Sequence, residues 1–184
     1  MTREQLIEGC LTSFASDFSR TWAEQVILTN SLPILWEIIE EREGLRLSKP
    51  DLEKLEFRSA YILEAVYLKN PTLFEPFINS FFELFPKVTN GSMRRHFAKI
   101  CFHAIKKGNN PPNSEAIATA CADWIIDPAT RIAVNVWALD ILIELNKTEK
   151  WIDDLLPEVV ASLSKNPSAG MIVRLRRIKS HKPI

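Results

Sequence analysis

The sequence predicts an all-α fold, and three observations support this prediction. Apolar residues recur at helical spacing along nearly the whole chain of 184 residues, with almost no alternation of the β type. Only five residues are glycine. The eleven prolines stand mostly where helices would begin or end, because the first turn of a helix tolerates a residue without an N–H.

Ten candidate helices follow one another through short connections, which favours antiparallel packing of neighbours. Asn70-Pro71 and Asp127-Pro128 are each typical of a helix cap followed by a first turn. The segment 71–85 is apolar on nearly all sides, so we expect it deep in the core. The expected helices cover residues 2–14, 19–31, 33–43, 50–69, 71–85, 91–107, 113–126, 128–146, 149–164 and 167–178.

A weak internal repeat accompanies these helices. Arginine recurs near the start of alternate helices, at Arg20, Arg58, Arg94 and Arg131, with separations of 38, 36 and 37 residues. A period of this length is typical of arrays of helix–turn–helix units. Because one helix pair cannot bury its apolar face alone, neighbouring pairs are expected to stack.

Three local features make the chain resemble the HEAT-repeat family. These features are the period, an early arginine with a small residue after it (Arg95 and Ala98), and the turn Asp127-Pro128 before Arg131. This aspartate lies closer to its arginine than is usual in the family, and the other turns lack it. The resemblance therefore implies an architecture and transfers no functional residue.

The resemblance is clearest over residues 50–164. It implies a right-handed α-α superhelix of about five antiparallel helix pairs, forming one domain over residues 1–184 with a short basic tail at 179–184. The alternative is a compact, irregular helical domain whose period is accidental.

Composition restricts the function further. Lys and Arg together number 23, as do Asp and Glu, and this balance argues against a nucleic-acid partner. Cys10, Cys101 and Cys121 have neither disulfide nor zinc-site spacing, so we expect buried thiols in a reducing compartment. No secretory leader and no run of 18 apolar residues is present, which predicts a cytoplasmic protein without a membrane span.

The clearest surface feature is a cationic stripe on the helix expected at 91–107. Its members fall within about 120° of arc on a helical wheel. They are Arg95, His96, Lys99, His103, Lys106 and Lys107. The stripe predicts an anion-facing surface, for which charge reversal at Arg95, Lys99 and Lys106 would leave the fold intact. The alternative is a solvated face, or one that is neutralised by the acids of the helix at 50–69.

These features favour a non-enzymatic protein-interaction or scaffold module whose partner is a protein with an acidic surface. No catalytic signature is present, and no cofactor or metal site is expected, since His96 and His103 are too far apart for a helical metal pair. Two alternatives stay open, a structural subunit of a larger assembly and a HEAT-like DNA glycosylase for alkylated purines. The glycosylase would use aromatic residues and an aspartate. The sequence offers two such pairs, Asp123 beside Trp124 and Asp140 three residues after Trp137. The oligomeric state is not predicted.

Overall fold

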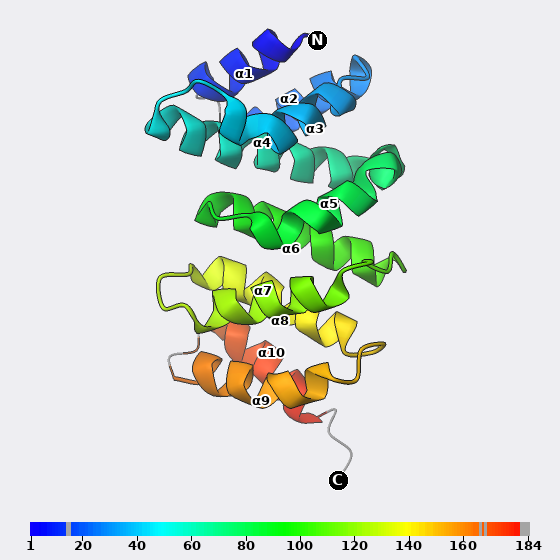
Figure 1. Cartoon of the computed structure of the whole chain (residues 1–184), viewed down its shortest axis with the longest axis vertical. Helices are drawn as coiled ribbons and strands as arrows, with labels where there is room; N and C mark the ends of the chain where they lie inside the picture. The colour runs from blue at the N-terminus through cyan, green and yellow to red at the C-terminus, as the bar shows by residue number, and fades with distance from the viewer. Residues whose placement is uncertain (14–15, 166, 168, 181–184) are drawn as a thin grey trace. The chain divides into compact units, whose positions relative to one another are not determined.

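The protein consists of helices joined by turns and loops in the residues that the computed structural model describes, which are 1–13, 16–165, 167 and 169–180 (Figure 1). No strand occurs among them, so the all-α prediction is confirmed. The chain divides into two compact units, residues 1–100 and 101–184. The division falls within one helix.

Unit 1 contains five complete α-helices, three short 3₁₀ segments and the first part of α6. In chain order they are α1 (Arg3–Thr12), α2 (Phe18–Leu28), α3 (Leu32–Glu41), η1 (Arg42–Gly44), α4 (Lys49–Lys69), η2 (Pro71–Phe77), α5 (Ile78–Leu84), η3 (Phe85–Lys87) and α6 (Gly91–Lys106).

Unit 2 contains the end of α6 and the remaining helices. They are α7 (Ser114–Ile126), α8 (Ile132–Leu145), α9 (Ile152–Leu163) and α10 (Ala169–Ser180). Of the predicted basic tail at 179–184, the first two residues continue α10, and residues 181–184 lie outside the described part of the chain.

Helix α4 organises unit 1, because α1, α2 and α3 all pack against it. The hydroxyl of Ser48 accepts the backbone N–H of Asp51 at 3.3 Å and caps its first turn. The apolar side of α4 is completely buried at Leu55, Ile62 and Val66. Burial on this scale supplies the main stabilising contribution in a helical domain.

Side chains of α4 also bind the end of α1. Arg58 donates to the carbonyl oxygen of Cys10 at 2.7 Å, and Lys54 donates to that of Leu11. The last carbonyls of a helix lack partners within it, so these cations satisfy groups that would otherwise be left unpaired. Another arginine of the repeat, Arg94, binds the turn carbonyl of Val88 in the same way, at 2.8 Å.

The apolar segment after α4 is buried as expected, although it is not one continuous α-helix. Phe74, Phe81 and Phe85 are completely buried. The α-helical part begins only at Ile78, because Pro76 lacks an N–H and its ring opposes an α-helical hydrogen bond to the preceding turn. The residues before Ile78 therefore form the 3₁₀ segment η2.

In unit 2, α7 packs against both α8 and α9, and α10 packs against α8. Helix α8 begins at Ile132, four residues later than predicted. The carboxylate of Asp127 accepts the N–H of Ala129 at 2.9 Å and the hydroxyl of Thr130 at 3.3 Å. Asp127 therefore stabilises a turn after α7 and does not cap α8.

The three cysteines are buried, as the sequence predicts. Burial raises the pKa of the Cys10 thiol to about 12, and it also raises the pKa values of Cys101 and Cys121 far above the usual thiol range. These thiols are accordingly core side chains with little thiolate character near neutral pH.

Candidate interaction surface

The cationic helix predicted at 91–107 is α6, and its start is fixed by Asn90. The side-chain oxygen of Asn90 accepts the N–H groups of Ser92 at 2.9 Å and Met93 at 3.0 Å. This is the hydrogen bonding of a helix N-cap. The Asn90 amide also donates to the Glu56 carboxylate of α4 at 3.0 Å, so the start of α6 is attached to α4.

The structure places His96 in the interior, unlike the exposed position that the helical wheel predicts. Its side chain is 3% exposed, and its Nδ1 lies 2.6 Å from Oε2 of Glu64. The ring stacks on Tyr61 with a centroid separation of 4.8 Å and lies 5.6 Å from Phe57. Helix α4 thus covers this part of the stripe, and His96 contributes no exposed charge.

Lys99 shares the same carboxylate. Its Nζ donates to Oε1 of Glu64 at 2.6 Å, so both oxygens of Glu64 have a partner from α6. This arrangement matches the alternative in which acids of the α4 segment neutralise the stripe. Lys99→Glu would place a second carboxylate beside Glu64, so charge reversal here is expected to disturb the fold. Arg95, by contrast, is exposed.

Glu64 has a lowered pKa as a result of these contacts. Burial alone would raise the pKa of its carboxyl group, but the hydrogen bonds and positive charges of His96 and Lys99 outweigh that effect. A carboxyl group whose pKa is lower in the folded state stabilises the fold above its unfolded pKa. That stability is lost as the pH falls through the folded pKa.

We therefore expect acid to destabilise unit 1 through Glu64. The free energy of unfolding should fall as the pH decreases from the ordinary Glu value of 4.5 toward the lowered value. Urea unfolding of wild type and Glu64→Gln would measure this. The wild type should be more stable by about 2 kcal/mol at pH 7, and the difference should vanish in acid. A difference that does not change with pH would contradict this assignment.

The part of α6 in unit 2 presents a different environment. The rings of Phe102, His103 and Trp137 are mutually in contact, with centroid separations of 5.2, 5.6 and 5.9 Å. All three side chains are half-buried. Lys106 lies with its Nζ 5.4 Å from the centroid of Phe102, in cation–π geometry, and both Lys106 and Lys107 are exposed.

Backbone hydrogen bonds close the C-terminal end of α6, next to these lysines. Gly108 follows the helix with φ 94°, a left-handed conformation that glycine adopts without a Cβ clash. Its N–H donates to Ile105, and the N–H of Asn109 donates to Ala104 at 3.2 Å, which closes the helix C-terminus. The helix dipole favours cations near a helix C-terminus, and this effect is one reason for lysines at positions 106 and 107.

Asp140, the aspartate of the glycosylase alternative, is held by an arginine. Arg174 of α10 donates through Nε to both Asp140 oxygens at 2.9 and 2.8 Å, and its Nη2 lies 2.8 Å from Oδ2. A carboxylate bound in this way joins α10 to α8. Trp124, beside Asp123, is 4% exposed and packs in the core of unit 2.

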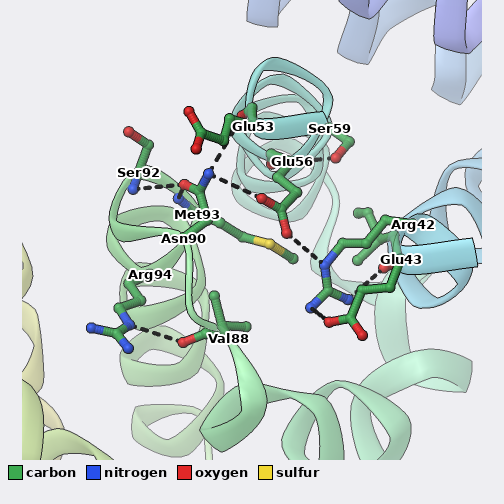
Figure 2. Close-up of polar contacts among 11 residues, drawn as sticks. Arg42, Glu43, Glu53, Glu56, Ser59, Val88, Asn90, Ser92, Met93 and Arg94 are labelled. Carbon is green, nitrogen blue, oxygen red and sulfur yellow. Dashed lines mark hydrogen bonds and ion pairs between the residues drawn. The ribbon is translucent and has the colours of Figure 1, made fainter. Parts of the chain in front are cut away.

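Sequence reasoning did not identify the buried polar network of unit 1, shown in Figure 2. Arg42 is 3% exposed, and its Nε donates to Oε1 of Glu56 at 3.0 Å. Its Nη1 donates to the carbonyl of Ile39 at 2.8 Å. Glu56 uses its other oxygen to accept the Asn90 amide, so the network joins the end of α3, the middle of α4 and the start of α6.

Comparisons with protein-family models, with curated proteins and with solved structures found no match to this chain. Among the described residues, no helix is long and apolar enough to cross a membrane. In the same part of the chain, no three His, Cys, Asp or Glu side chains are grouped closely enough to hold a metal ion.

Proposed function

We propose that this protein is a non-enzymatic protein-interaction module with a HEAT-like architecture. In this proposal the helices form about five antiparallel pairs in one right-handed array over the whole chain, and the protein acts in the cytoplasm. Two of the four repeated arginines support the repeat interpretation, because Arg58 and Arg94 both bind main-chain carbonyls at the ends of helices or turns. Arg20 differs, since it is exposed and pairs with Asp17.

The observation that carries the proposal is the half-buried aromatic cluster of Phe102, His103 and Trp137 beside exposed Lys106 and Lys107. Protein interfaces are enriched in aromatic residues, and a few such residues provide most of the binding energy. Surrounding charges select a partner of opposite sign and accelerate association. Helix α6 carries no acidic residue, so its partner is a protein with an acidic surface.

A nucleic-acid enzyme gains no support from the site geometry. A glycosylase would use its aspartate in the reaction, whereas Asp140 is engaged by Arg174 at 2.8 Å. The equal numbers of acidic and basic residues also oppose a DNA partner.

The proposal is tested by affinity capture from native lysate with nuclease present. The baits are wild type, Lys106→Glu/Lys107→Glu, and a control with the same change in net charge, Lys87→Glu/Lys150→Glu, at exposed sites elsewhere. We expect a protein that wild type and control retain and that the first variant binds at least several-fold more weakly. Arg95→Glu, tested alone, shows whether the exposed arginine of unit 1 contributes.

Identical capture by all three baits, or no captured protein, would contradict the proposed surface. Lys99 is left unchanged in every bait because it binds Glu64. Equal thermal unfolding of the three baits shows that lost capture does not arise from lost folding.

A further inference from the structure

We infer that the partner is an acidic protein segment that places a large apolar or aromatic side chain against the ring cluster of unit 2. The ring cluster is defined as Phe102, His103 and Trp137. This inference rests on the proposed function and adds the chemistry of the segment that is bound. It also assigns most of the binding energy to the aromatic rings of this cluster, whereas the sequence indicated that the positive charges of α6 would bind the partner.

The geometry of the cluster supports an apolar contact at its centre. Two helices contribute to it, α6 with Phe102 and His103 and α8 with Trp137. The ring centroids of the two α6 residues lie 5.6 and 5.9 Å from that of Trp137. Rings that are partly buried against each other are already restrained, so a partner loses little of its binding energy to ordering them. Their half-buried state leaves part of the aromatic surface to be covered.

The charges near the cluster identify the sign of the segment. Lys106 lies over Phe102 with its ammonium 5.4 Å from the ring centroid, and Lys107 is exposed at the same helix end. Both acidic side chains of α8 are paired with a cation, Asp140 with Arg174 at 2.8 Å and Glu144 with Lys147 at 2.6 Å. A segment with carboxylates on either side of one apolar residue therefore complements both the rings and the lysines.

Single-stranded nucleic acid is the competing class of partner, because its bases also stack on aromatic rings and its phosphates pair with lysines. The sequence as a whole favours protein. Lys and Arg number 23 and are matched by 23 Asp and Glu, whereas a nucleic-acid groove normally belongs to a clearly basic protein.

The test is selection of a random 12-residue peptide library, displayed on phage, against the full chain. We expect the enriched peptides to be net negative and to share one aromatic or large aliphatic residue. Their affinity, measured by fluorescence anisotropy, should fall by about tenfold or more with Trp137→Ala or with Lys106→Glu/Lys107→Glu. The control Lys87→Glu/Lys150→Glu should bind normally.

Two further variants distinguish a loss of binding from a loss of folding. Trp137→Phe keeps an aromatic ring and should retain most of the affinity. His103→Ala removes a different ring of the same cluster and leaves the tryptophan unchanged. Circular dichroism melting of each variant identifies any that is not folded. Binding measured only with folded variants then reports on the cluster itself.

Three results would overturn the inference. The first is the absence of any enriched peptide, or enrichment without an acidic excess. The second is an acidic peptide that binds Trp137→Ala as tightly as wild type. In that case the inference fails, while cation-dependent capture of a protein would still support the proposed function. The third is salt-sensitive binding of a 20-nucleotide oligo-dT, lost in the cluster variants, without peptide binding.

Discussion

Glu56→Ala is expected to lower the free energy of unfolding by about 3–5 kcal/mol. The substitution leaves the guanidinium of Arg42, which is 3% exposed, without its buried carboxylate partner. It also removes the closer of two acceptors of the Asn90 amide, the Glu56 carboxylate at 3.0 Å, and leaves the Glu53 carbonyl at 3.5 Å. Urea unfolding followed by circular dichroism measures the change. A loss below about 1 kcal/mol would show that Arg42 finds other partners.

Two comparisons separate the network from ordinary surface charge. Lys69→Ala removes one member of an exposed ion pair with Glu24, and it should leave the unfolding midpoint almost unchanged. Arg42→Met/Glu56→Leu removes both buried charges together. Because no unpaired charge remains, the double variant should be much more stable than Glu56→Ala. Equal losses in the single and double variants would assign the effect to side-chain packing.

The network also shows what a sequence can and cannot predict in this chain. Ten α-helices were expected and ten occur among the described residues, because capping, proline placement and apolar spacing are local signals. The contacts of Glu56 are not local, since its partners lie 14 residues before it and 34 residues after it. A single sequence does not indicate which of several glutamates meets a buried arginine.

The same limit applies to the candidate surface. A helical wheel groups Arg95, Lys99 and Lys106 on one side of α6, but it does not show which part of the helix a neighbour covers. His96 lies on the predicted cationic face and is buried, because Tyr61 and Glu64 of α4 pack over it. Trp137 packs against Phe102 of α6 and is nevertheless only half-buried. Exposure of this kind depends on tertiary packing.

Gly9→Ala is expected to destabilise the protein by about 2 kcal/mol, although alanine is the better helix former. Gly9 lies inside α1, where alanine would gain about 1 kcal/mol in helix propensity. A Cβ at this position would lie 2.0 Å from Cη2 and 2.1 Å from Cζ2 of Trp22. Atoms cannot approach this closely, so the whole indole must move away from its contact with Phe18.

The matched control is Gly44→Ala, which has the same chemistry and no atom within 4 Å of the new Cβ. It should leave stability unchanged or raise it slightly, because alanine restricts the unfolded chain. Gly9→Ala/Trp22→Leu should recover stability relative to Trp22→Leu alone, since the smaller side chain makes room for the methyl group. If Gly9→Ala destabilises equally with either residue at position 22, the close approach of the indole is not the cause. If it stabilises both, helix propensity outweighs packing at this position.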